Sequence, residues 1–139
     1  VVGQMPESEH YRNVERHDVM TDPHILSMRI DESLYFANAA YLEDMVFAQA
    51  ALRDDLLHVI LMCPAVNAID LSALEALEEI NARLKENNVA LHLSEVKGPV
   101  MDALKRSDLL THLSGEIFLS HHSAVMALRA KETADPALT

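Results

Sequence analysis

The stretch that most restricts the fold is LLHVILMC at residues 56–63, an almost unbroken apolar run with turn-forming residues on both sides. It is far shorter than the roughly 20 apolar residues of a membrane-spanning helix. A strand that is covered on both faces is apolar at successive positions, as the strands of parallel sheets are. The run therefore predicts a central strand of a parallel sheet, whose crossover connections are usually helices.

Predicted strands and helices alternate on both sides of this run. Upstream come a strand at HILSMRI (24–30), a short strand at SLYFA (33–37) and a helix from the N-cap Asn38 to about Arg53. Downstream come a helix from Leu71 to Leu84, a strand at VALHLSEV (89–96), a helix from Pro99 to about Arg106, a short strand at GEIFL (115–119) and a last helix capped by Ser120. This order predicts an α/β fold with a mixed β-sheet, parallel central strands and about four helices packed against it. The two strands at 24–30 and 33–37 are close enough in sequence to form the antiparallel pair.

The helix after the central strand has the clearest apolar face. The residues predicted to face the core are Leu71, Leu74, Leu77 and Ile80. Charged residues, mostly glutamates, occupy the opposite side. One side of this helix is therefore expected to pack on the sheet.

The segment AIDLSALEAL (68–77) contains two side chains that could cap this helix. Ser72 and Glu75 form the S-x-x-E pattern of a capping box, while Asp70 is an equally good N-cap. A phosphate on Ser72 would suit the amides and the dipole of a helix start, but Asp70 and Glu75 would repel its charge. Capping is therefore the preferred role of Ser72. The predicted surface for a partner or ligand is the preceding loop, Pro64, Ala65, Val66 and Asn67.

The composition excludes several classes of function. The formal net charge is -11, whereas nucleic-acid binding and docking on an anionic membrane both need clustered Lys and Arg. The three glycines form neither a P-loop nor a dinucleotide fingerprint. The eight histidines include no H-x-x-x-H pair, and no serine lies in a G-x-S-x-G elbow. We therefore expect no nucleic-acid polymer as partner, no catalytic residues, no metal and no cofactor.

A phosphoreceiver domain is a competing α/β interpretation. Such a domain needs clustered acids at the end of its first strand to hold Mg²⁺, and only Asp31 and Glu32 lie near that position. Lys97 could stand for the receiver lysine, but Gly98 separates it from Pro99. This interpretation is the weaker one.

The strand, its loop and AIDLSALEAL together resemble a STAS domain, the module shared by bacterial anti-sigma-factor antagonists and SulP (sulfate permease) anion transporters. The antagonists carry Asp-Ser-Ser-Gly here, and their second serine is phosphorylated. Asp70 matches the aspartate and Ser72 that serine, whereas Leu71 and Ala73 replace the first serine and the glycine. The stretches that resemble the transporters in particular are EHYRNVERH (9–17), ILSMRIDESLYFANAAYLED (25–44) and, more weakly, IFLSHHSAVMAL (117–128).

The resemblance to the transporters implies a domain organisation and a role. Residues 1–23 would be a linker that follows a transmembrane region, residues 24–131 the STAS domain and residues 132–139 a flexible tail. The absence of a methionine at Val1 fits a domain cut from a longer chain. The implied role is non-catalytic regulation at the cytoplasmic face of the membrane, next to the transmembrane domain of the same transporter chain. A cytosolic protein or a nucleotide is the implied ligand, and the parent transporter could form a homodimer.

The alternative is a free-standing anti-sigma-factor antagonist that is switched by phosphorylation of Ser72. A hydrophobic region encoded upstream of Val1 would favour the transporter, and a start codon near it the antagonist. Because Leu71 and Ala73 depart from the antagonist motif, we expect no kinase switch in this chain. A small enzyme is a third possibility, but the sequence nominates no nucleophile, base and oxyanion donor together.

Overall fold

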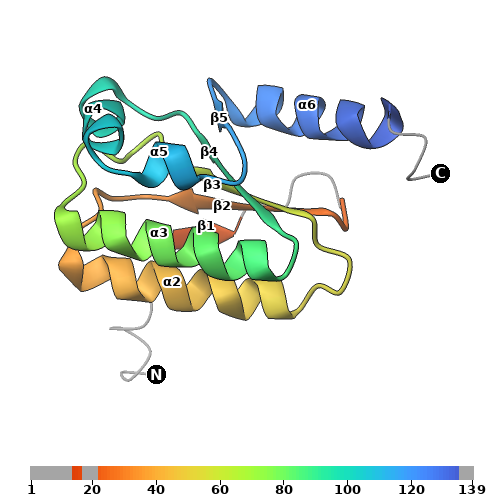
Figure 1. The fold of residues 1–139 in the computed structure, drawn as a ribbon, viewed down its shortest axis with the longest axis horizontal. Helices are drawn as coiled ribbons and strands as arrows, with labels where there is room; N and C mark the ends of the chain where they lie inside the picture. The colour runs from red at the N-terminus through yellow and green to blue at the C-terminus, as the bar shows by residue number, and fades with distance from the viewer. Residues whose placement is uncertain (1–13, 17–21, 135–139) are drawn as a thin grey trace.

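Five strands form one sheet in the order β1-β2-β3-β4-β5 in the computed structural model, which describes residues 14–16 and 22–134 (Figure 1). The strands are β1 (Val14–Arg16), β2 (Ile25–Ile30), β3 (His58–Met62), β4 (Ala90–Ser94) and β5 (Ile117–Phe118). β1 pairs antiparallel with β2, and all other neighbours are parallel. The predicted mixed sheet with parallel central strands is therefore confirmed.

The antiparallel strand, however, is not the one that the sequence predicted. Residues 33–37 form no strand; only Leu34 makes an isolated bridge, to Ile69. The chain enters a helix at Phe36 instead, and the side-chain oxygen of Asn38 accepts a hydrogen bond from the Tyr35 N–H. Asn38 thus supports the helix start from its third residue and is not the N-cap. The antiparallel partner of β2 is β1, which lies in the segment 1–23 that was predicted to be a linker.

The helices are α2 (Phe36–Ala51), α3 (Leu71–Glu86), α4 (Gly98–Arg106), α5 (Leu109–His112) and α6 (His121–Ala134). The single turn α5 was not predicted. Ser120 does stand before α6 as expected, and its hydroxyl oxygen accepts from the Ser123 N–H at 3.0 Å.

The order of the strands decides which face of the sheet each helix covers. Successive strands are neighbours, so right-handed crossovers put their connecting helices on one face. α2 and α3 lie side by side along that face, and α6 lies on the opposite side of the sheet (Figure 1). The main core fills the space under α2 to α5. α6 covers a smaller cluster, made of Ile25, Ile60, Met62, Ala124 and Leu128.

The buried face of α3 differs from the prediction at one position. Leu77, Ile80 and Leu84 are buried and Leu74 is partly buried, but Leu71 is 71% exposed. Leu71 is the first helical residue and lies roughly 200° around the helix from the buried Ala73. The apolar spacing of Leu71 was therefore misleading, because the buried face begins at Ala73.

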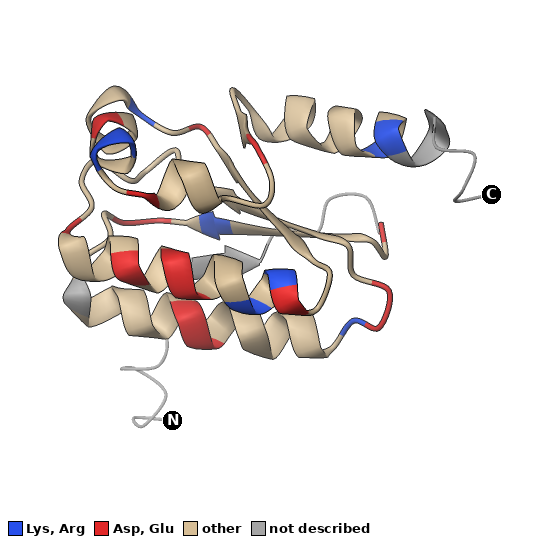
Figure 2. Cartoon of the chain, in the orientation of Figure 1, with Lys and Arg blue, Asp and Glu red and all other residues tan. Residues whose placement is uncertain are grey.

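The charged residues of the outer helices α2 and α3 are mainly acidic (Figure 2). The acidic residues are Glu43, Asp44, Glu75, Glu78, Glu79 and Glu86, against Arg83 and Lys85. Arg83 lies 3.9 Å from the ring centre of Phe47 and 3.7 Å from a carboxylate oxygen of Glu43, so it links the two helices. Among the described helices, none is long and apolar enough to cross a membrane.

Candidate functional site

The loop after β3 lies at the carboxyl edge of the parallel strands, the edge where α/β proteins commonly bind ligands. Val66 is buried in the main core, whereas Pro64 and Asn67 are exposed and Ala65 is half-buried. Val66 thus anchors the loop, and its neighbours face solvent.

Hydrogen bonds hold this loop to the segments that follow β2 and β4. The Ser33 hydroxyl oxygen accepts from the backbone N–H groups of Asn67 and Ala68, at 3.0 and 3.1 Å. The Lys97 ammonium group donates to the side-chain oxygen of Asn67 at 2.7 Å. The loop is therefore fixed between two neighbouring connections, as a recognition surface requires.

Asp70 caps α3. Its carboxylate oxygen accepts from the Ala73 N–H at 2.8 Å, and its own N–H donates to the Leu34 carbonyl. Ser72 is already the second residue of the helix, so its side chain is past the position from which a cap reaches the first amides. The preferred capping role of Ser72 was wrong, and the other candidate, Asp70, has that role.

Ser72 lies in a groove of about 260 Å³ between α2 and α3. The groove is lined by Ala39, Ala40, Glu43, Ser72, Glu75, Ala76 and Glu79. A phosphate on Ser72 would add negative charge beside three glutamates, which costs free energy through like-charge repulsion. That Ser72 is not a kinase switch stays a prediction, and the three surrounding glutamates favour this prediction.

Two exposed apolar side chains lie at the same edge of the sheet. Tyr35 precedes α2 and Leu71 begins α3, and both are at least half exposed. Together with Pro64, Asn67 and Lys97 they form what we call the carboxyl-edge surface. Ser33 and Tyr35 were not predicted to belong to this surface, and Lys97 was considered only as the counterpart of a receiver lysine. Their positions directly after predicted parallel strands could have revealed them, because the carboxyl ends of such strands meet at one edge.

The capping assignment predicts unequal effects of two neighbouring substitutions. Asp70→Ala removes the acceptor for the Ala73 N–H and should lower the free energy of unfolding by about 0.5–2 kcal/mol. Ser72→Ala should change it by less than about 0.5 kcal/mol, as surface substitutions usually do. Urea denaturation followed by circular dichroism measures both. A larger loss in Ser72→Ala than in Asp70→Ala would contradict the assignment.

Polar contacts attach the start of α6 to the sheet. The Ser27 hydroxyl and the His121 Nε2 atom are 2.7 Å apart, and Glu95 accepts from the His121 N–H at 2.9 Å. Ser27 and His121 have the spacing of a nucleophile and its base, but Ser27 is buried in the middle of β2. A substrate could not reach its hydroxyl, so we interpret this pair as a structural contact.

A pair of histidines on the same face joins β3, β4 and β5. The Glu116 N–H donates to His92 Nδ1 at 3.0 Å, which leaves the His92 ring proton on Nε2. His92 Nε2 then donates to His58 Nδ1, also at 3.0 Å, and leaves the His58 proton on Nε2. Burial, and then the nearby His58, lower the pKa of His92 to about 4. Burial, followed by the charge of Lys131, also lowers the pKa of His58.

Gly115 lets the backbone before β5 approach the His92 ring. A Cβ atom at this position would lie 2.2 Å from the Leu91 carbonyl oxygen and 2.4 Å from His92 Nδ1. Only glycine therefore fits here without a shift of the chain. In the described ranges, no group of three or more His, Cys, Asp or Glu side chains is placed to hold a metal ion.

Comparison with known proteins identifies the family. A family model described as the STAS domain matches residues 16–124, which include most of the sheet and helices α2 to α5. The chain belongs to the STAS domain family. The resemblance of AIDLSALEAL and its flanking stretches to this family is thereby confirmed.

Relatives of this STAS domain include sulfate transporters of plants. "Sulfate transporter 3.1" of Arabidopsis thaliana is 34% identical over 139 residues, covering 91% of this chain and 21% of the relative. "High affinity sulfate transporter 1" of Stylosanthes hamata is 30% identical over 146 residues, covering 96% of this chain and 22% of the relative. The chain thus spans about a fifth of the length of these relatives.

Solved structures share the STAS fold at low sequence identity. The murine solute carrier 26 family member A9 anion transporter has a TM-score of 0.73 at 18% identity, covering 93% of this chain and 24% of that one. The STAS domain of a SulP transporter from Vibrio cholerae has a TM-score of 0.67 at 16% identity, covering 84% and 89%. The unphosphorylated anti-sigma factor antagonist SpoIIAA has a TM-score of 0.69 at 11% identity, covering 84% and 96%. The predicted STAS-like fold is confirmed.

Proposed function

We propose that this STAS domain is a non-catalytic regulatory and interaction domain of a SulP-type anion transporter. The observation that carries the proposal is the 34% identity to a sulfate transporter over 91% of this chain. Because the domain corresponds to a fifth of that relative, transport itself would belong to the rest of the protein. The loop at residues 64–67 is fixed by hydrogen bonds to Ser33 and Lys97. This fixed loop and the exposed side chains of the carboxyl-edge surface support a role in recognition.

The proposed organisation follows from this assignment. Residues 1–23 would follow a transmembrane region as a linker, residues 24–131 would form the STAS domain at the cytoplasmic face of the membrane, and residues 132–139 would be a tail. The helix α6 continues to Ala134, so residues 132–134 of the predicted tail belong to that helix. β1 occupies residues 14–16 of that linker, so these three residues belong to the sheet. The proposed partners are the transmembrane domain of the same chain and a cytosolic protein or nucleotide, within a homodimeric transporter.

The details of the α3 start favour a transporter domain over a free-standing antagonist. Where the antagonist motif has a serine, this chain exposes Leu71, and where it has a glycine, this chain buries Ala73. An exposed leucine suits a contact with another protein surface better than a site for phosphate. Ser72 in its acidic groove adds to this argument.

A transport assay tests the proposal. The full-length protein encoded by the native gene would be expressed in cells that lack their own sulfate uptake. Deletion of residues 24–131 should abolish uptake of labelled sulfate or surface expression. Leu71→Glu, at the carboxyl-edge surface, should reduce one of them at least severalfold. Leu52→Glu is the matched control, because Leu52 is 73% exposed at the other end of α2, after its last residue.

Two results would contradict the proposal. One is a gene that encodes no membrane-spanning region before residue 1. The other is full uptake and surface expression after the deletion. Equal uptake by Leu71→Glu and Leu52→Glu would overturn only the role of the carboxyl-edge surface.

A further inference from the structure

The face of the sheet under α6 is more polar than the face under α2 to α5. Because side chains alternate along each strand, those on the α6 side include three buried polar ones, Ser27, His92 and Ser94. The only other buried polar residue in the described ranges is Asn81 of α3. Among its described side chains, α6 contributes just two buried ones to this face, Ala124 and Leu128. This helix is therefore held with less apolar burial than the helices over the main core.

Titratable residues take part in the polar side-chain contacts that join β5 and α6 to the other strands. The His92 ring of β4 accepts the Glu116 N–H at 3.0 Å, just before β5. At the start of α6, His121 Nε2 lies 2.7 Å from the Ser27 hydroxyl, and the His121 N–H donates to Glu95 at 2.9 Å. A change of protonation at these groups therefore acts directly on how β5 and α6 are attached.

The connection before β5 is held by groups that do not titrate. The side-chain oxygen of Asn81 accepts from both the N–H and the hydroxyl of Ser114, at 3.0 Å each. The Ser114 hydroxyl oxygen in turn accepts from the Leu91 N–H at 3.1 Å. Ser114 is thus fixed to α3 and β4 whatever the pH. The residues beyond it, 115–134, are contiguous, and we call them the β5–α6 unit.

His92 cannot hold a second proton while this unit is in place. Its Nε2 proton is donated to His58, so a further proton would be added at Nδ1. There it would meet the Glu116 N–H, and two donors cannot form a hydrogen bond. The Gly115 backbone lies so close that a Cβ atom would overlap the His92 ring, so the ring cannot turn away without moving this backbone. Protonation of His92 therefore displaces the start of the β5–α6 unit.

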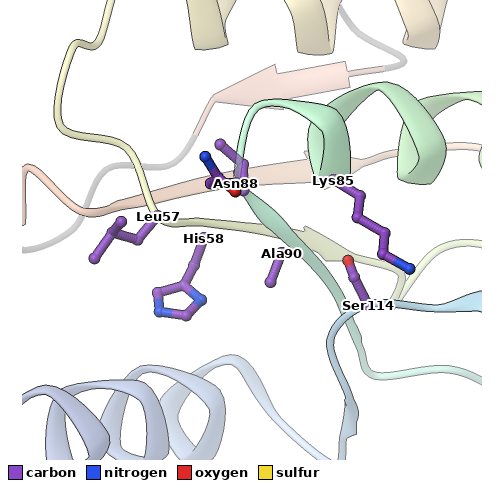
Figure 3. A pocket seen from close by; sticks show the side chains of 7 residues that line it. Leu57, His58, Lys85, Asn88, Ala90 and Ser114 are labelled. Atoms are coloured by element: carbon purple, nitrogen blue, oxygen red, sulfur yellow. The ribbon is translucent and has the colours of Figure 1, made fainter. Parts of the chain in front are cut away.

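His58 connects the buried ring of His92 with solvent. A hollow of about 380 Å³ lies where β3 and β4 begin, and His58 is one of the residues that line it (Figure 3). Figure 3 shows the His58 side chain pointing from β3 to the side of the sheet on which α6 lies. His92 itself is 2% exposed. The hollow thus gives protons access to the pair through His58.

The charges around the pair do not compensate for a proton on it. The charged and titratable groups on the surrounding elements are Asp22 and His24 before β2, Lys85 of α3, Glu95 after β4, Glu116 before β5, and His121 and Lys131 of α6. Lys131 opposes a positive charge on either ring. Of the two carboxylates that favour one, Glu116 is already bonded to Lys131 at 2.9 Å. The other, Asp22, is paired with Arg129 at 3.1 Å.

We propose that acid releases the β5–α6 unit from the sheet in one local opening, while the rest of the domain stays folded. Opening removes the Glu116 N–H from His92 and lets both rings of the pair take up protons. It also uncovers the apolar side chains that α6 covers on the sheet, Ile25, Ile60 and Met62. Acid would thus change the surface of the domain without unfolding its main core. This inference does not rest on the proposed transporter role, since it concerns the chain itself.

The two protonation states of His92 set the size and the sign of the effect. In the closed unit, burial and then the nearby His58 lower the pKa of His92 to about 4. In the open unit this pKa returns toward about 6.5. Between these values the open form binds a proton that the closed form does not, so opening becomes more favourable as the pH falls. For His92 alone, the ratio of open to closed molecules should rise about tenfold between pH 7.5 and pH 5.5.

Labelling of a buried thiol tests the release. Ala124→Cys places a thiol on the buried face of α6, and the native Cys63 in the main core reports on unfolding of the whole domain. A dipyridyl disulfide reagent labels both thiols, and peptide mass spectrometry distinguishes them. Met126→Cys, at a 56% exposed position of α6, gives the unhindered rate at each pH. Relative to that rate, labelling of Ala124→Cys should rise about tenfold from pH 7.5 to pH 5.5 and stay well ahead of Cys63.

Two further substitutions, made together with Ala124→Cys, test the mechanism. His92→Asn cannot titrate, so the opening should lose most of its pH dependence. Gly115→Ala should release the unit already at pH 7.5, because its Cβ has no room between the Leu91 carbonyl and the His92 ring. Gly98→Ala is the matched control, since nothing lies within 4 Å of a Cβ atom there. Thermal melts check that each variant is folded.

Other results count against the proposal. If Ala124→Cys and Cys63 are labelled at the same rate, the domain opens as a whole and not as a unit. If acid leaves the labelling of Ala124→Cys unchanged, or raises it equally in His92→Asn, protonation of His92 does not release the unit. Equal labelling in Gly115→Ala and Gly98→Ala would refute the coupling through the backbone before β5. None of these measurements involves sulfate uptake, so this inference and the proposed function fail separately.

Discussion

Replacement of Leu77 by aspartate should abolish the cooperative unfolding transition of this STAS domain. Leu77 is 3% exposed and packs in the main core between α3 and the sheet. Its burial stabilises the fold by roughly 1.5–3 kcal/mol, and an unpaired buried carboxylate costs several kcal/mol more. Domains of this size have a total stability of about 5–15 kcal/mol, so the variant loses most or all of it.

The same helix supplies the control for this experiment. Leu71→Asp makes the same chemical change six residues earlier, at a side chain that is 71% exposed. Its effect on the free energy of unfolding should stay within about 0.5 kcal/mol. Thermal and urea denaturation of both variants gives the comparison. If Leu77→Asp melts like the parent, or if Leu71→Asp is the more damaging change, the placement of α3 is wrong.

Leu71 and Leu77 also show which structural features the apolar pattern of the sequence could predict and which it could not. The run at 56–63 predicted β3 correctly, because a short continuous apolar run is typical of a central strand that is covered on both faces. The periodicity of α3 predicted Leu77 and Ile80 in the core, but it could not show where the helix begins, so Leu71 was assigned to the wrong side. The helix begins at Leu71 because the Asp70 carboxylate caps it by accepting from the Ala73 N–H. The sequence offered both Asp70 and Ser72 as caps, so it could not show which of the two begins the helix.

Elements that depend on long-range pairing were the hardest to predict. β1 has three residues in a polar stretch and is defined only by its pairing with β2, whereas SLYFA has strand-forming residues but leads into α2. The histidine pair was equally hidden, because the register that sets Ile60 opposite His92 brings His58 within reach of it. Alternation along each strand does show that His58 and His92 could share a face, but not that they would meet.

Acid should destabilise this domain through His92. The ring is 2% exposed and accepts the Glu116 N–H, so the folded protein holds it neutral and its pKa falls to about 4. In the unfolded chain the pKa returns to about 6.5. Between these two values the unfolded chain binds the proton and the folded one does not, so the free energy of unfolding decreases as the pH falls. The loss starts near pH 6.5, reaches about 2 kcal/mol by pH 5 and ends at roughly 3 kcal/mol below about pH 4. The lowered pKa of His58 acts in the same direction.

A non-titrating variant isolates this effect from the carboxylates, which also titrate in acid. In His92→Asn the side-chain oxygen can take the place of Nδ1 as the acceptor for the Glu116 N–H, but it binds no proton in this range. The variant should be less stable than the parent at pH 7.5 and should lose less stability between pH 7.5 and pH 5. His122→Asn, at an exposed position of α6, should follow the parent. Urea denaturation at half-unit steps of pH measures all three. Parallel losses in the parent and His92→Asn would show that the buried pair does not set the acid sensitivity, since only His92 differs between them.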